Sequence, residues 1–178
     1  MFFDLQPDFL QDDLIKLLPL QEYDFEKLFE VASDPLVWEQ HPNPNRYKLE
    51  DFTNYFKGAI ISKGAFLILD SFTNEVVGCS RYYDFNKDDN SVLIGYTFIG
   101  LKFWGKGYNK ALKKIMLQYA FQFVDKAYFH IGSSNYRSQK AIEKIGAAKV
   151  DEFEVVYYGE ASKLNFVYQI SKNSSDVH

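Results

Sequence analysis

The sequence holds a single cysteine, Cys79, among its 178 residues. One thiol cannot form an intramolecular disulfide, and it excludes the cysteine-rich zinc sites of many small domains. The three histidines, at positions 41, 130 and 178, lie too far apart in the chain to show a ligand spacing. We therefore expect no metal site and interpret Cys79 as a core residue of a strand. The scarcity of thiols also suits a reducing cytoplasm.

Arginine is scarce too, with 3 residues against 17 lysines, and the net charge is −4. A protein that binds nucleic acid mainly through phosphate contacts needs the opposite balance, so we expect no direct nucleic-acid partner. No apolar run approaches the length of a membrane span, and we expect no membrane partner. The stretch MFFDLQPDFLQDD lacks the basic region of a signal peptide. Together these absences predict a cytoplasmic protein.

Apolar and aromatic residues are abundant, at 47% and 18% of the chain. That content is sufficient for one sizeable hydrophobic core. No linker, internal repeat or low-complexity segment divides the chain. We expect a single domain over residues 1–178, of which residues 171–178 form a frayed polar tail.

Hydrophobic periodicity predicts alternating strands and helices. Helical spacing marks residues 22–34, 49–62, 108–124 and 135–146, and strand-like runs mark residues 13–20, 64–70, 76–85, 91–99, 126–132, 148–159 and 163–170. The order β-α-α-β-β-β-α-β-α-β-β combines an antiparallel meander with a strand–helix–strand crossover. The sequence thus predicts an α+β (mixed α/β) fold around one sheet.

The stretch GLKFWGKGYNKAL (100–112) places three glycines between a predicted strand and a predicted helix. A tight turn with a positive φ explains one of them. A phosphate cradle explains all three better, because glycine leaves backbone N–H groups bare at the positive end of a helix dipole. Neither common nucleotide motif is complete. Gly107 replaces the hydroxyl residue that would hold magnesium in a triphosphate loop, and the dinucleotide fingerprint lacks its third glycine.

The run KFWGKG (102–107) resembles the Q/R-x-x-G-x-G/A signature for acetyl-coenzyme A in the GNAT N-acetyltransferase superfamily, with Lys at the first position. The run NYRSQKAIEKIGA (135–147) resembles the second signature, in which an Asn opens the helix after the fifth strand and a Ser follows three residues later. Residues 12–38 resemble the ribosomal-protein N-terminal serine and alanine acetyltransferases. The resemblance covers about residues 12–170.

This resemblance implies a GNAT-like fold. Its central sheet would be mostly antiparallel, with about seven strands and about four flanking helices. The fourth and fifth strands would run parallel and splay apart, and the pantetheine arm of acetyl-CoA would enter the split. Two helices, expected at residues 22–34 and 49–62, would frame the acceptor.

The resemblance also implies the coenzyme contacts. The pantetheine arm would pair with the backbone at Phe98 and Ile99. The pyrophosphate would lie on the loop formed by Trp104, Gly105, Lys106, Gly107, Tyr108 and Asn109. Asn135 would bond the pantetheine arm, although it is equally suited to cap a helix. Ser138, a further coenzyme contact, would protonate the leaving thiolate, or it is an ordinary serine of a first helical turn.

Two positions depart from the family pattern. The Glu that serves many members as general base is replaced by Leu93, and the Tyr that serves as general acid is replaced by Ile142. As replacement bases the sequence offers Glu152, with Glu154 on the same strand face, and His41 in a Pro- and Asn-rich loop. Each also has a plain interpretation as a surface side chain.

We therefore predict that the protein transfers an acetyl group from acetyl-CoA to a primary amine by direct attack on the thioester. The nearest branch implies a protein N-terminus, with a ribosomal protein as the named partner. The alternatives are a small-molecule amine acetyltransferase, an acetyl-CoA-binding sensor without turnover, and a domain whose glycines serve only a turn. The sequence leaves open the acceptor and the choice between monomer and homodimer.

Overall fold

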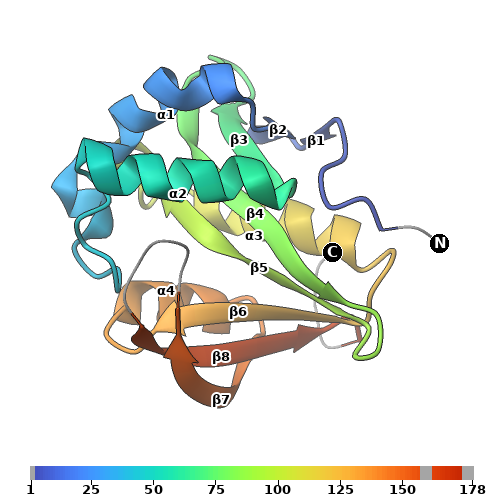
Figure 1. Ribbon diagram of the computed structural model, residues 1–178. Coiled ribbons are helices and arrows are strands. Elements are labelled where there is room, and N and C mark those ends of the chain that lie inside the picture. The colour runs from blue at the N-terminus through green and yellow to red at the C-terminus, as the bar shows by residue number, and fades with distance from the viewer. Residues whose placement is uncertain (1–2, 157–161, 174–178) are drawn as a thin grey trace.

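The centre of the fold is an eight-stranded sheet, counted over residues 3–156 and 162–173, which the computed structural model describes (Figure 1). The strands are β1 (Leu10–Gln11), β2 (Ile15–Pro19), β3 (Ala65–Asp70), β4 (Val76–Asn86), β5 (Ser91–Ile99), β6 (Lys126–Gly132), β7 (Ala148–Val155) and β8 (Lys163–Ser171). Their spatial order is β1-β2-β3-β4-β5-β6-β8-β7. Neighbouring strands run antiparallel, apart from the parallel pair β5–β6.

Helices cover both faces of this sheet, as Figure 1 shows. The α-helices are α1 (Phe25–Ala32), α2 (Leu49–Ser62), α3 (Tyr108–Ala120) and α4 (Tyr136–Glu143). We call the side covered by α1 and α2 the α2 face, and the side covered by α3 and α4 the α3 face. Within the described part of the chain, no helix is both long and apolar enough to cross a membrane.

The predicted order of elements is confirmed, and so is the mixed α/β class. The prediction of about seven strands missed β1, a two-residue strand that pairs with β2. The third predicted helix ends earlier than expected, at Ala120, because residues 121–123 form a turn before β6. The outer part of the predicted strand 148–159 and most of the predicted tail 171–178 lie outside the described residues.

Two hydrophobic cores hold the layers together. On the α2 face, Phe52, Phe56 and Trp38 pack with Phe98 of β5, and the rings of Trp38 and Phe98 lie 4.9 Å apart between centroids. On the α3 face, Leu112 and Met116 belong to a core that also includes residues of β2 to β6 and β8. Cys79 is fully buried in the first core, as the sequence predicted.

The parallel pair β5–β6 is joined over only part of its length. Register pairing runs from Ser91 opposite Lys126 to Leu93 opposite Tyr128 and then stops, although both strands continue. The predicted splayed pair is therefore confirmed. A bulge in β5 lies beyond this point, where Tyr96 adopts a positive φ of 51°. An aromatic residue in this region is strained, and bulges of this kind recur beside active sites.

We expect Gly78→Ala to weaken the junction of β4 and β5. A Cβ at Gly78 would lie 2.0 Å from the backbone oxygen of Phe98, so one strand would have to move. The expected loss of unfolding free energy is roughly 2–3 kcal/mol, measurable by urea denaturation. Gly95→Ala is the matched control, because its Cβ would meet only the Tyr83 ring at 3.1 Å, which can give way. Equal stability of both variants would contradict this packing argument.

Candidate functional site

The glycines of the turn between β5 and α3 are required for two different reasons. Gly105 and Gly107 have positive φ angles of 72° and 88°, which only glycine adopts without strain. The φ of Gly100 is not positive. A Cβ at this position would lie 2.8 Å from Val31 Cγ1, so this glycine is required for packing. Above Gly105 an added Cβ would meet nothing within 4 Å. The turn is thus open at the position where the sequence predicted a ligand.

The N-terminus of α3 lies directly behind this turn. Its cap residue is Gly107, and no side chain caps the helix. The first backbone N–H groups of a helix have no partner within the helix, so an uncapped N-terminus can receive an anion. Lys106 and Lys110 are exposed beside it, whereas Lys102 forms an ion pair with Glu75. Lys106 and Lys110 therefore add positive charge beside the N-terminus of α3.

Two aromatic residues hold the turn in place. Trp104 donates from Nε1 to the Ile99 carbonyl at 2.7 Å, which folds the turn back onto the end of β5. Tyr108 donates its hydroxyl to Asp70 Oδ2 at 2.5 Å and so links α3 to the end of β3. This bond lowers the pKa of Asp70 to about 2 and raises that of Tyr108 to about 12. Trp104 and Tyr108 therefore position the turn as well as lining it. Asn109 is half-buried in the first turn of α3.

Asn135 caps the N-terminus of helix α4, and its side chain accepts from the Ser138 N–H at 3.2 Å. The capping interpretation of Asn135 is therefore confirmed, while its bond to the coenzyme stays a prediction. Ser138 is half-buried in the first turn, and its role as proton donor is likewise untested.

Three segments meet at the open end of the split. The guanidinium of Arg137 on α4 lies 3.9 Å from the centroid of the Trp104 ring, and the Arg137 N–H donates to Gln40 Oε1 at 3.2 Å. Pro42 lies against Gly132 at the end of β6, where a Cβ would approach it to 2.3 Å. The glycine turn, the start of α4 and the loop after α1 are thereby joined around the diverging ends of β5 and β6.

Phe98 and Ile99, the residues of β5 predicted to pair with the pantetheine arm, point their side chains to opposite faces of the sheet. Phe98 packs into the core on the α2 face, and Ile99 belongs to the core on the α3 face. Both residues are in the part of β5 that has no register pairing with β6. Any contact of Phe98 with a pantetheine arm would therefore be made by its backbone. The Ile99 carbonyl is already bonded to Trp104.

On the α2 face, rings surround the split. Tyr83 and Tyr96 lie 5.0 Å apart, and His130 of β6 lies 5.0 Å from Phe153 and 6.5 Å from Tyr83, between ring centroids. These rings are half-buried or exposed. Within the described residues, the His130 ring nitrogens have no hydrogen-bond partner. Burial lowers the pKa of His130 below its usual 6.5, so the ring is neutral at pH 7.

His41 is more enclosed than the sequence suggested. Its Nδ1 accepts from the Asn43 N–H at 3.0 Å, and its Nε2 lies 3.3 Å from Arg46. Burial and the Arg46 charge hold the pKa of His41 well below its usual value. The ring is neutral, but protein groups already occupy both of its nitrogens.

The two candidate carboxylates lie on the edge strand β7. Glu152 is exposed and pairs with Lys149 at 2.6 Å, and Glu154 accepts from Ser162 at 3.1 Å. Glu152 lies opposite Phe166 in the register, and Phe166 packs against the core of the α3 face. Directly opposed residues share a face, so both carboxylates lie on the α3 face, away from His130. No described contact joins Glu152 to Ser138, and its role as base stays a prediction without support from its position.

The two usual catalytic positions hold residues that cannot titrate, Leu93 and Ile142. Ile142 is buried in the core of the α3 face. Leu93 pairs with Tyr128 at the last joined position of β5 and β6. On the α2 face of β6, the residue that follows Tyr128 is His130, because side chains alternate along a strand. A titratable group is thus supplied by the strand next to the one that carries Leu93.

Sequence reasoning gave no role to two polar residues, half-buried His130 and buried Lys113. Lys113 is buried on α3. Its signal was its place at spacing i, i+3, i+4 and i+7 with Met116, Leu117 and Ala120, which is the spacing of a buried stripe. The signal of His130 was its place between Phe129 and Ile131 in a predicted strand. Because side chains alternate along a strand, His130 lies on the opposite face from these two apolar residues. Among the described residues, no group of three or more His, Cys, Asp or Glu could hold a metal.

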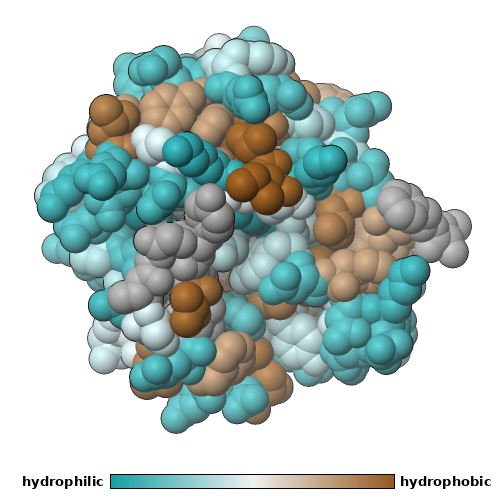
Figure 2. Space-filling model, in the orientation of Figure 1, coloured by the Kyte–Doolittle hydropathy of each residue, from teal (hydrophilic) through white to brown (hydrophobic). Residues whose placement is uncertain are grey.

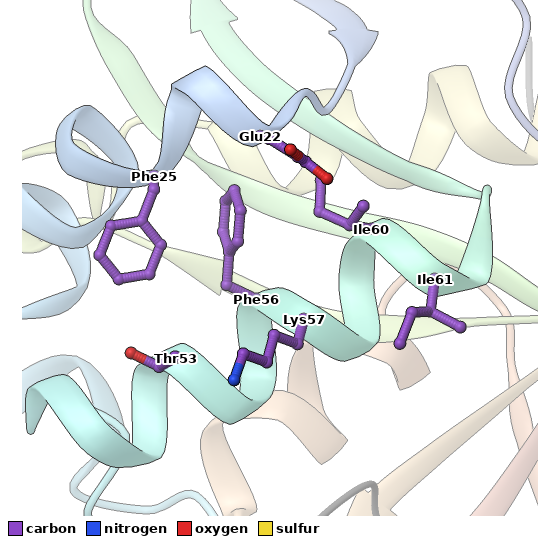
Figure 3. Close-up of a pocket in the computed structure, with 7 residues that line it drawn as sticks. All are labelled: Glu22, Phe25, Thr53, Phe56, Lys57, Ile60 and Ile61. Atoms are coloured by element: carbon purple, nitrogen blue, oxygen red, sulfur yellow. The ribbon is translucent and has the colours of Figure 1, made fainter.

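A separate apolar groove lies between α1 and α2. Figure 3 shows Phe25 and Phe56 between the two helices, with Ile60 and Ile61 further along α2. Figure 2 shows apolar atoms over this face within a mostly hydrophilic surface. None of the residues that line the groove belongs to the turn, to α4 or to the split. We therefore separate it from the candidate site.

Comparison with known proteins agrees with this geometry. A family model described as an acetyltransferase (GNAT) domain matches residues 15–148. No curated protein matches the sequence significantly.

Solved structures show the same fold. An acetyltransferase (GNAT family) from Bacillus anthracis superposes with a TM-score of 0.74 at 20% identity, over 93% of this chain and 99% of its own. A Vibrio cholerae protein, provisionally described as a ribosomal-protein-serine acetyltransferase, gives 0.74 at 17% identity, over 93% and 99%. The microcin C7 self-immunity acetyltransferase MccE, solved with acetyl-CoA and AMP, gives 0.74 at 14% identity, over 94% and 98%.

The open glycine turn, the uncapped α3 and the splayed strands are thus explained together: the chain belongs to the GNAT family of acetyl-CoA-dependent N-acetyltransferases.

Proposed function

We propose that the protein acetylates the N-terminal amine of a polypeptide. The observation that carries this proposal is the split between β5 and β6, whose two faces carry different groups. The glycine turn and the start of α4 border it at one end and suit the coenzyme. The half-buried rings of Tyr83, Tyr96 and His130 border it on the α2 face and suit an acceptor.

The acceptor surface supports a peptide because it is aromatic and includes an exposed ring. Phe153 is 42% exposed beside His130, so a chain that follows the N-terminal amine can continue along β7. Aromatic rings offer large contact areas to peptide side chains. The description of the Vibrio cholerae structure favours the same acceptor class.

A small amine that carries an acidic group is the second candidate, and Arg81 favours it. This residue is 3% exposed on β4, and its guanidinium stacks 3.8 Å from the centroid of the Tyr96 ring. Its Nε has no hydrogen-bond partner in the described structure. A buried unpartnered N–H is costly, and a carboxylate or phosphate of the acceptor would satisfy it.

Within either function, His130 would take the proton from the attacking amine. The amine must be neutral to attack a thioester, so a neutral base beside it speeds the reaction. His130 is neutral at pH 7, has unoccupied ring nitrogens in the described structure, and lies on the acceptor side of the split. His41 has the first property only.

The acceptor class is tested by thiol release from acetyl-CoA. We expect turnover with peptides that have a free N-terminal Ser or Ala, and none with the same peptides blocked at the N-terminus. Free amino acids and phosphorylated amines form the second panel. Turnover only with the second panel would show that the acceptor is a small amine with an acidic group and not a peptide.

The coenzyme turn is tested by Gly105→Glu. The added Cβ enters open space, so the variant should be destabilised only by the strain of a positive φ, which costs about 1–2 kcal/mol. Its negative charge opposes a phosphate at the N-terminus of α3, and we expect acetyl-CoA binding by calorimetry to be lost. Gly105→Asn is the control, because Asn tolerates this backbone region without adding charge. Normal binding by the Glu variant would place the phosphates elsewhere.

The base is tested by His130→Phe, which keeps a ring against Tyr83 and Phe153. Because burial holds the pKa of His130 below its usual 6.5, wild-type kcat/KM should fall as the pH drops through the pKa of this ring. The variant should lose about 100-fold in rate and lose this acid limb. His41→Asn should keep the limb. If the His130→Phe variant kept the wild-type pH profile, His130 would be excluded as the base.

A further inference from the structure

Lys113 is a buried amine in the middle of the protein. It lies on α3 with 6% exposure, and its Nζ donates to Thr97 Oγ1 of β5 at 2.8 Å. Thr97 Oγ1 lies 2.7 Å from Ser80 Oγ of β4, so the three polar groups form one chain. The same Nζ lies 5.5 Å from the centroid of the Phe129 ring of β6.

This environment is unfavourable for a lysine that only supports the fold. Burial lowers the pKa of Lys113 from its usual 10.5 to about 7. The groups that face it from β4, β5 and β6 are the two hydroxyls and the Phe129 ring, and no described carboxylate pairs with it. A buried charged group of this kind is costly, and the shift of its pKa makes Lys113 a candidate for a functional role.

The position of Lys113 relates it to the split. Thr97 and Phe129 both follow the last joined pair, Leu93 and Tyr128, on their strands. The Lys113 amine therefore lies near both diverging strands on the α3 face, which also carries the glycine turn and α4. His130 is on the opposite face of β6. The two titratable groups thus border the split from opposite sides.

We propose that Lys113 is the proton donor to the coenzyme A sulfur when the acetyl group is transferred. The amine nitrogen forms its bond to the carbonyl carbon, and the carbon–sulfur bond breaks with its electron pair left on sulfur. Lys113 gives one ammonium proton to that sulfur and becomes neutral. The attacking nitrogen loses one proton to a base, which releases it to water, and Lys113 takes one proton back from water. The products are an amide and a thiol, so atoms and charge balance.

Lys113 would replace the general acid that is missing because the usual Tyr position holds Ile142. A lysine that is partly protonated near pH 7 can both give a proton and regain it, whereas a serine hydroxyl such as that of Ser138 ionises far less readily. The inference rests on acetyl transfer from acetyl-CoA, which is common to the family. It does not depend on which amine is the acceptor.

Lys113→Met tests the proposal, with Lys114→Met on the same helix as control. Methionine keeps the length of the side chain and removes the buried amine. We expect the thermal midpoint of Lys113→Met to equal or exceed that of wild type, while kcat falls about 100-fold. Lys113→Gln, which keeps a donor to Thr97 but carries no charge, should show the same loss of kcat if the Met variant fails to fold.

The second measurement needs no acceptor and no turnover. Coenzyme A is bound to each protein, and the ionisation of its thiol is followed through the ultraviolet absorbance of the thiolate as the pH rises. Lys113 keeps part of its charge near pH 7 and there favours the thiolate. The bound thiol should therefore begin to ionise about one pH unit lower in wild type and Lys114→Met than in Lys113→Met.

Equal thiol pKa values in all three proteins, or wild-type kcat in Lys113→Met, would overturn the proposal. A lowered thermal midpoint with an unchanged thiol pKa would identify Lys113 as a structural group. Loss of turnover with every amine tested, together with the expected shift of the thiol pKa, would leave the proposal standing and count against the acceptor assignment.

Discussion

The structure depends on the point at which β5 and β6 stop pairing. Beyond Leu93 and Tyr128, the edges of two adjacent central strands no longer bond each other, in a region where buried backbone groups need partners. Side chains supply some of them. Tyr55 donates to the carbonyl of Tyr96 at 2.6 Å, and Trp104 donates to that of Ile99. An extended polar ligand would supply others, so the split suits the binding of such a ligand.

The opening also divides the chemistry between two faces. His130 borders it on the α2 face and Lys113 on the α3 face, and burial lowers the pKa of both toward or below neutrality. An acyl transfer to an amine needs one group that accepts a proton and one that donates it. A base and an acid that border one split from opposite sides meet this requirement without the usual Glu and Tyr, whose places are taken by Leu93 and Ile142.

The loop end of the site is held by contacts between segments that are distant in the chain. Arg137 of α4 stacks on Trp104 of the turn, and Gln40 bonds the backbone of Arg137. Tyr108 ties the start of α3 to β3 through Asp70. These contacts fix the relative positions of the turn and the two helix N-termini. A turn built from glycines would otherwise have too much conformational freedom to present its N–H groups in one arrangement.

The sequence by itself determined the order of strands and helices and the glycine turn, because periodicity, helix caps and positive-φ glycines are local properties of the chain. The splayed pair was implied by the resemblance to the family. The sequence also identified Leu93 and Ile142 as departures from the family pattern. Only the tertiary structure decided which polar residues face the split. The face of Glu152 depends on its register against β8, and the surroundings of Lys113 depend on three strands from elsewhere in the chain. Burial and the pKa shifts it causes arise from such long-range packing, which no local pattern specifies.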